Sequence, residues 1–157
     1  YENGVFFLPQ LMRSAEVSQQ AFDLLENYLG DAESMQKATL VIGTVKGDVH
    51  DIGKNMVAVM VKNHGYRVVD LGKNVSAEAF IAAVKEYDAE FLGLSALMTT
   101  TMQEIPRVIA MLREHCPNTK VIIGGAVITE EFARECGADG FGRDAVQTVK
   151  IMDGLLS

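Results

Sequence analysis

One histidine of this chain has neighbours that suit it to bind a metal. His50 follows Asp48 by two positions, within a long polar segment that covers residues 43–55. A carboxylate at this spacing can hydrogen-bond one imidazole nitrogen and leave the other free, which is how proteins orient a metal-ligating histidine. The residue types thus allow a histidine ligand that an aspartate holds in place, but by themselves they favour a histidine that binds no metal.

The glycines of the same segment do not match a phosphate-binding loop. Five residues, rather than four, separate Gly47 from Gly53-Lys54, and Asn55 stands where a P-loop has serine or threonine. No two of these glycines are separated by a single residue, so the dinucleotide-binding pattern is absent as well. The segment indicates a ligand other than a bare phosphate.

The pattern on both sides of this segment predicts an α/β protein. Short β-rich runs alternate with helical stretches of about ten to fifteen residues. The expected strands are Thr39–Thr44, Tyr66–Leu71, Phe91–Ser95, Lys120–Gly124 and Gly140–Phe141. The expected helices are Ile52–His64, Ala77–Tyr87, Met102–His115, Thr129–Cys136 and Ala145–Leu155. This alternation favours a five-stranded parallel sheet in the flavodoxin-like (Rossmann-like) order 2-1-3-4-5.

In such a sheet the ligand site lies outside the carboxyl ends of the strands, where the strand order reverses. Here the reversal falls between the first and third expected strands. The segments that follow these strands, residues 43–55 and 95–101, should therefore meet at one edge of the sheet. The candidate ligand His50 belongs to the first of them.

Composition and charge exclude several classes of protein. The chain has 157 residues, 48% apolar and 22% charged, which suits one globular domain. Its net charge of −7 opposes binding to nucleic acid or to an anionic membrane surface. The longest apolar run, Met56–Val61, is far too short to span a bilayer. Cys116 and Cys136 have neither zinc-site nor redox-motif spacing, so we expect free thiols and a cytoplasmic protein.

The first part of the chain has a different pattern. Apolar residues recur at helical spacing over residues 8–29, which predicts an amphipathic helix ahead of the α/β segment. The chain begins at Tyr1 rather than at methionine, and Val5, Phe6 and Phe7 precede any element that would bury them. We therefore expect the chain to be a fragment of a longer protein.

Three short motifs follow one another at the expected carboxyl ends of strands. They are Asp48-x-His50-x-x-Gly53, Ser95-Ala96-Leu97 and Gly124-Gly125. Together they resemble the D-x-H-x-x-G, S-x-L and G-G elements of cobalamin-binding domains in B12-dependent methyltransferases and mutases. Residues 43–55 are similar, almost without departure, to the corrinoid carrier proteins of anaerobic methyl transfer and to the matching domain of methionine synthase.

The resemblance extends to the N-terminal segment. Residues 6–16 resemble the last helix of the four-helix cap that covers the upper face of cobalamin in those proteins. The resemblance thus implies two domains. Residues 1–36 would be the C-terminal remnant of a helical-bundle cap, and residues 37–157 the cobalamin-binding domain.

The resemblance also implies a mode of binding. Cobalamin, as methylcobalamin or a related corrinoid, would bind with its dimethylbenzimidazole base displaced and with His50 as the lower axial ligand of cobalt. Asp48 would hydrogen-bond the far imidazole nitrogen. Thr101, which aligns with a serine of methionine synthase, would extend this relay. The candidate catalytic residues are therefore Asp48, His50 and Thr101. The implied cofactor-binding set is Gly47, Asp48, Val49, His50, Asp51, Ile52, Gly53, Ser95, Leu97, Thr99, Thr101, Gly124, Gly125, Ala126 and Phe141.

Small residues in this set are interpreted as room for the displaced nucleotide tail. A valine at Gly125 is therefore expected to block the tail and to leave the sheet folded. From the residues alone a structural role is an equal alternative, because Gly53 can serve helix–sheet packing and Gly124-Gly125 can form a plain turn.

The function that the resemblance implies is that of a corrinoid methyl carrier. Cobalt would accept a methyl group from a substrate-specific methyltransferase and give it to a second, acceptor methyltransferase, and a reductive activator would be a further partner. The chain would not turn over substrate alone. One alternative is an adenosylcobalamin mutase domain or a B12-dependent regulator. Another is a flavodoxin-like module without corrinoid, in which Asp48, His50 and Asp51 bind a metal directly.

Overall fold

The computed structural model describes residues 13–14, 17 and 36–156. The chain divides into two units, residues 1–36 and 37–157, and the second unit contains all the strands and helices named below. The helix predicted over residues 8–29, and with it the cap remnant, lies almost wholly outside the described residues. The assignment of residues 1–36 to a helical cap therefore stays a prediction.

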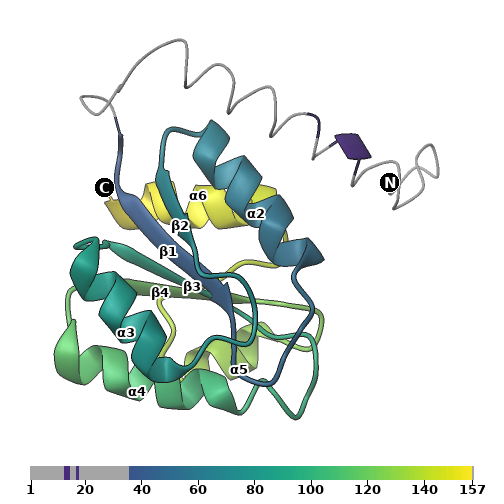
Figure 1. Ribbon diagram of the computed structural model, residues 1–157, viewed down its shortest axis with the longest axis vertical. Helices are drawn as coiled ribbons and strands as arrows, with labels where there is room; N and C mark the ends of the chain where they lie inside the picture. Colours follow the sequence, from purple (N-terminus) through teal and green to yellow (C-terminus); the bar gives the residue numbers. More distant parts are fainter. Residues whose placement is uncertain (1–12, 15–16, 18–35, 157) are drawn as a thin grey trace. The chain divides into compact units, whose positions relative to one another are not determined.

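A parallel five-stranded sheet forms the centre of the second unit (Figure 1). In spatial order the strands are β2 (Arg67–Asp70), β1 (Thr39–Thr44), β3 (Phe91–Ser95), β4 (Lys120–Gly124) and β5 (Gly140–Phe141). The register pairs Thr44 with Ser95 and Ser95 with Gly124, so β1, β3 and β4 end at one level. The predicted order 2-1-3-4-5 is confirmed, and among the strands only β2 differs from its predicted bounds, by one residue at each end.

Helices cover both faces of the sheet (Figure 1). On one face lie α2 (Ile52–Asn63) and α6 (Ala145–Leu156); on the other lie α3 (Ala77–Glu86), α4 (Glu104–His115) and α5 (Glu130–Glu135). Successive side chains of a strand point to opposite faces. Accordingly, Leu40 and Ile42 of β1 belong to the apolar cluster that includes Val61 of α2, whereas Val41 belongs to the cluster beneath α3 and α4. This two-sided burial explains why the strands are apolar almost throughout.

Side-chain oxygens cap several of these helices at their first turn. Asp144 Oδ1 accepts a hydrogen bond from the Gln147 backbone N–H at 2.7 Å and so caps the start of α6. Thr129 accepts from the Phe132 N–H at 3.1 Å and so lies just outside α5, which starts one residue later than the sequence predicts. These caps fix where α5 and α6 begin after the loops at the carboxyl edge.

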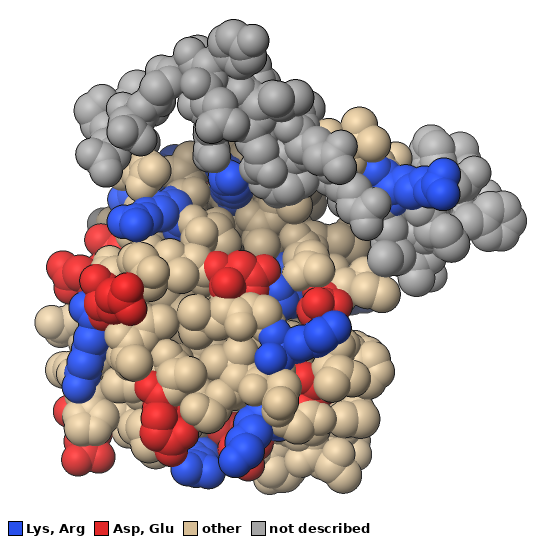
Figure 2. All heavy atoms as spheres, in the orientation of Figure 1, with Lys and Arg blue, Asp and Glu red and all other residues tan. Residues whose placement is uncertain are grey.

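The surface of the described residues is mixed in charge. On the face drawn in Figure 2, acidic and basic side chains are interspersed in small groups, so that face presents no continuous basic surface. None of the helices described for this chain has both the length and the apolar character needed to cross a membrane.

Candidate functional site

The loop between β1 and α2 carries Asp48 and His50. Asp48 is fully buried, whereas the side chain of His50 is 47% exposed. His50 Nδ1 lies 2.8 Å from Asp48 Oδ1, and the His50 backbone N–H donates to the same oxygen at 3.0 Å. Because the partner of Nδ1 is a carboxylate, the neutral ring carries its hydrogen on Nδ1. Nε2 therefore keeps its lone pair for another partner.

The second carboxylate oxygen joins this loop to the loop that follows β3. Asp48 Oδ2 accepts a hydrogen bond from the buried Thr101 hydroxyl at 2.7 Å and one from the Leu97 backbone N–H at 2.7 Å. The structure thus brings together Asp48, His50 and Thr101, in the order that the sequence indicates. The meeting of the loops after β1 and β3 at the carboxyl edge is confirmed.

The hydrogen bonds around Asp48 keep it ionised. Burial alone raises the pKa of its carboxyl group, because a charged group loses hydration. The Leu97 N–H, the Thr101 hydroxyl and the two donors of His50 lower that pKa by more, so the net pKa lies well below the usual value for aspartate. A carboxylate held in this state makes the imidazole a more basic ligand at Nε2.

Two further residues hold this loop that sequence reasoning did not identify. Thr44, buried at the end of β1, donates its hydroxyl to the His50 carbonyl oxygen at 3.1 Å. Lys54, only 3% exposed, donates from Nζ to Asp70 Oδ2 at 2.5 Å and to Asn55 Oδ1 at 2.6 Å. This ion pair ties the first turn of α2 to the end of β2. The sequence draws attention to Lys54 only through the P-loop pattern, which the segment does not match.

Backbone atoms of neighbouring loops leave no room for a side chain at Gly124, which ends β4, or at Gly125, which follows it. A Cβ atom on Gly125 would overlap the Ala96 carbonyl oxygen, and the φ of Gly125 is +135°. A Cβ on Gly124 would lie 2.7 Å from the Gly142 carbonyl oxygen. A larger side chain at Gly125 would thus disturb the loops after β3 and β4 themselves, contrary to the expectation that it would only fill a slot. The part of this pair in cofactor binding stays a prediction.

We expect Gly125→Ala to lower the free energy of unfolding by about 1–3 kcal/mol, because the backbone must shift to relieve the overlap with Ala96 and a side chain disfavours this φ. Urea denaturation of the cofactor-free protein measures this change. A variant as stable as the wild type would show that the loops relax without cost.

Gly53 has the opposite surroundings. A Cβ at this position, in the first turn of α2, would meet no atom within 4 Å. The alternative that Gly53 is small for helix–sheet packing is therefore wrong. Three apolar side chains of the flanking segments are also exposed to solvent, Val49 (59%), Ile52 (43%) and Leu97 (39%). The surface beside His50 is thus open and partly apolar.

The remaining predicted site residues all belong to the carboxyl edge or to the last strand. Gly47 has a φ of +83° in a tight turn, and Asp51 Oδ2 lies 3.8 Å from Lys73 Nζ. Ser95 is half-buried at the end of β3, and Phe141 of β5 is half-buried against the core. Thr99 and Ala126 are exposed in the loops after β3 and β4.

The alternative of a direct metal site at Asp48, His50 and Asp51 does not fit this geometry. Both oxygens of Asp48 accept hydrogen bonds from N–H or O–H groups, and Asp51 is directed to Lys73. Over residues 13–14, 17 and 36–156, no three His, Cys, Asp or Glu side chains group as a metal site. Of the Asp48 and His50 side chains, the His50 ring keeps Nε2 for a ligand, while both Asp48 oxygens accept hydrogen bonds.

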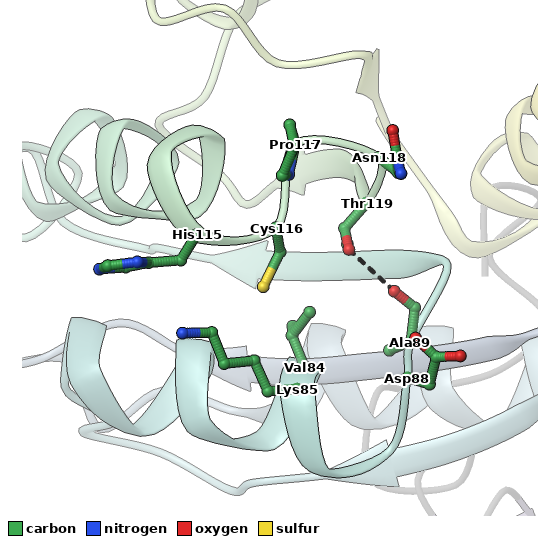
Figure 3. Close-up of a pocket in the computed structure, with 9 residues that line it drawn as sticks. All are labelled: Val84, Lys85, Asp88, Ala89, His115, Cys116, Pro117, Asn118 and Thr119. Atoms are coloured by element: carbon green, nitrogen blue, oxygen red, sulfur yellow. Dashed lines mark hydrogen bonds between the residues drawn. The ribbon is translucent and has the colours of Figure 1, made fainter.

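The hollow drawn in Figure 3 lies at the other edge of the sheet. Its lining comes from the C-terminal ends of α3 and α4 and from the loops that follow them. Ala89 and Thr119, which are hydrogen-bonded at 2.9 Å, directly precede the region of β3 and β4, so the hollow is at the amino ends of these strands. None of the predicted site residues lines it.

Comparison with known proteins places the chain in a family. A family model for the B12 binding domain matches residues 38–150. Dimethylamine corrinoid protein 3 of Methanosarcina acetivorans is 40% identical over 158 residues, which cover 99% of this chain and 74% of that protein. A corrinoid protein of Desulfitobacterium hafniense is 38% identical over 161 residues, with coverage of 99% and 74%.

Solved structures agree with this match. The methanol:cobalamin methyltransferase complex MtaBC from Methanosarcina barkeri contains a chain with a TM-score of 0.83 and 36% identity, covering 99% of this chain and 60% of that one. A cobalamin-binding protein from Desulfitobacterium hafniense gives a TM-score of 0.80 and 32% identity, with coverage of 99% and 74%. The chain therefore belongs to the B12-binding domain family and is a corrinoid protein.

Proposed function

We propose that this protein binds cobalamin with the nucleotide base displaced and His50 on cobalt, and that it carries a methyl group between methyltransferases. The observation that carries the proposal is the state of the His50 ring. Its Nδ1 is fixed by a buried carboxylate, while Nε2 of the half-exposed ring is free to bind a metal. Imidazole nitrogen is a suitable ligand for first-row transition metals such as cobalt.

The residues around His50 fit a large, partly apolar ligand such as a corrin. Val49, Ile52 and Leu97 expose apolar surface on both loops, and solvent-exposed apolar side chains that cluster mark binding surfaces. Gly53, the residue after Ile52 in α2, leaves open space, because a Cβ at this position would meet no atom within 4 Å. These features favour a bulky group seated over the carboxyl edge.

The protein's own part in the chemistry is to hold and tune the ligand. Bound cobalamin supplies the cobalt that accepts and releases a methyl group. Asp48 keeps the imidazole ring in one orientation and makes Nε2 more basic. Thr101 and the Leu97 N–H in turn hold the carboxylate, so the position of Nε2 is set by contacts from two loops.

The partners that we propose are a substrate-specific methyltransferase, a second methyltransferase that accepts the methyl group, and a reductive activator. Support for the first comes from the likeness to a chain of a methanol:cobalamin methyltransferase complex and to dimethylamine corrinoid proteins. Transfer of an isotopically labelled methyl group from a substrate-specific methyltransferase onto the reconstituted protein tests this role. A protein that holds cobalamin but never becomes labelled with any methyltransferase of the methanol or methylamine systems would contradict it.

We expect Gly53→Val to weaken cobalamin binding at least about tenfold, because its side chain would occupy space that the cofactor needs. The stability of the cofactor-free protein should stay within about 0.5 kcal/mol, since valine and glycine differ little in helix propensity and no neighbour is displaced. Spectral titration with cobalamin and urea denaturation measure the two quantities.

Gly154→Val is the matched control for this prediction. Gly154 also lies in a helix, α6, and a Cβ there also meets nothing within 4 Å. The control should bind cobalamin as the wild type does. Equal affinity in the Gly53 and Gly154 variants would remove Gly53 from the cofactor site.

A further inference from the structure

We propose that Asn74, in the loop between β2 and α3, is a positioning residue for His50. The inference rests on the proposed role of His50 as the cobalt ligand. None of the three sequence motifs includes Asn74, and it makes its contacts from the loop that follows β2, the strand on the far side of β1 from β3. Its effect on the site would pass through Gly47 and Asp48.

Asn74 bonds the ligand loop on both sides of the Gly47–Asp48 peptide unit. Its side-chain oxygen Oδ1 accepts a hydrogen bond from the Gly47 backbone N–H at 2.8 Å. Its own backbone N–H donates to the Asp48 carbonyl oxygen at 3.0 Å. The Asp48 N–H in turn donates to the Val45 carbonyl oxygen at 3.1 Å and closes a tight turn in which Gly47 has a positive φ. The backbone on both sides of Asp48 is therefore fixed.

The loop after β2 is itself held firmly against the end of β1. The Thr44 N–H donates to the Gly72 carbonyl oxygen at 2.9 Å, and the Val75 N–H donates to the Thr44 carbonyl oxygen at 3.0 Å. Val45 and Val75 form a parallel bridge, and both are buried. This pairing continues the β1–β2 ladder beyond the strands and brings Asn74 next to Gly47.

The residue type at position 74 meets two requirements at once. Its φ is 58°, in the left-handed region that asparagine, aspartate and glycine tolerate best. Its side chain must also present an acceptor to the Gly47 N–H. Glycine meets only the first requirement, whereas aspartate meets both. Substitutions at this position can therefore separate the hydrogen bond from the backbone conformation.

A shift of the Gly47–Asp48 peptide would change the position of the His50 imidazole ring. The Asp48 carboxylate is the hydrogen-bond partner of His50 Nδ1, and it bonds Thr101 at the same time. Since both carboxylate oxygens are engaged, Asp48 cannot move without lengthening one of these bonds. Loss of the Asn74 oxygen should thus widen the range of positions that Nε2 occupies, which weakens a bond that needs one geometry.

The test compares Asn74→Gly with Asn74→Asp, and uses Asp88→Gly as a matched control. Asp88 is the other non-glycine residue with a positive φ in the described part of the chain, at 47°, and it lies in the hollow at the opposite edge of the sheet. Three quantities are measured: amide hydrogen exchange at Gly47 without cofactor, the affinity for cobalamin, and the nitrogen coupling of the Co(II) state in electron paramagnetic resonance.

We expect Asn74→Gly to speed amide exchange at Gly47 about tenfold and to weaken cobalamin binding about fivefold to tenfold, as the loss of one hydrogen bond allows. The hyperfine splitting from the histidine nitrogen should be seen in only a part of the Co(II) protein. Asn74→Asp should restore most of all three quantities, and Asp88→Gly should leave them at wild-type values.

These measurements distinguish a failure of the role inferred for Asn74 from a failure of the proposed cobalt ligand. If Asn74→Gly speeds exchange at Gly47 but keeps wild-type affinity and full histidine coupling, Asn74 is a structural residue only and the inference is overturned. If the wild-type protein itself shows no histidine coupling, the proposed cobalt ligand is wrong, and this is seen without any variant.

Discussion

Replacing Asp48 with alanine should lower the free energy of unfolding by about 3–5 kcal/mol, because a buried group with several partners is removed. The wild-type carboxylate accepts four hydrogen bonds, from the Leu97 N–H, the Thr101 hydroxyl, and the backbone and ring nitrogens of His50. Each buried donor left without an acceptor costs about 1–3 kcal/mol. Urea denaturation of the cofactor-free protein measures the loss.

Two companion variants show where this effect comes from. Asp48→Asn keeps one acceptor oxygen but places an NH2 group against donors, so we expect a smaller loss of about 1–3 kcal/mol. Asp51→Ala removes a half-buried carboxylate of the same loop whose partner, Lys73, is 3.8 Å away, and it should change stability by less than about 1 kcal/mol. Equal losses in Asp48→Ala and Asp51→Ala would contradict the network around Asp48.

His50→Ala should weaken cobalamin binding at least about 100-fold, because it removes the proposed cobalt ligand, and loss of a residue that merely supports a ligand already costs about 10–100-fold. The cofactor-free protein should lose little stability, since the ring is half-exposed and gives up one hydrogen bond. Spectral titration of the cofactor-free protein with cobalamin measures the affinity.

His64→Ala is the control for the histidine substitution. His64 ends α2 and bonds the Met60 carbonyl oxygen at 2.8 Å, away from the carboxyl edge of the sheet. Its replacement should leave cobalamin binding unchanged. An affinity of His50→Ala within twofold of that of His64→Ala would mean that the imidazole of His50 adds nothing to binding.

Much of the fold follows from the sequence because the signals are local and repeated. The central strands β1, β3 and β4 are apolar runs buried on both faces, and glycine or proline follows the ends of α2, α4 and α5. Four of the five strands have the predicted bounds. The meeting of the loops that carry Asp48 and Thr101 was also predictable, since the carboxyl ends of neighbouring parallel strands meet at one edge, whereas the bond between these two residues was implied by the family resemblance. These are consequences of pattern and topology together.

The contacts that hold the loop could not be read from the sequence in the same way. Lys54 is buried because Asp70, sixteen positions later, ends the neighbouring strand β2, and only the register brings the two together. Asparagine is common in turns, so the sequence at Asn74 indicates a turn residue and gives no sign of its hydrogen bond with Gly47. Such roles depend on distances between loops, for which sequence spacing carries no signal.

Glycines show the same limit most clearly. Gly53 and Gly125 are each the last residue of a sequence motif, and both were interpreted as small residues that leave room for the cofactor. The atoms around them give opposite answers, because Gly53 has open space and Gly125 has a backbone oxygen where a Cβ would be. Neighbouring backbone, and not residue type, decides which glycine is available to a ligand.

Electron paramagnetic resonance of the Co(II) state tests most directly whether His50 binds cobalt. The protein is reconstituted with cobalamin, once with natural histidine and once with histidine labelled with nitrogen-15. We predict hyperfine splitting from one axial nitrogen, a splitting pattern that changes on labelling the protein's histidine, and loss of this nitrogen signal in His50→Ala. A splitting that is unaffected by labelled histidine, and that changes instead with labelled dimethylbenzimidazole, would contradict the proposed binding mode.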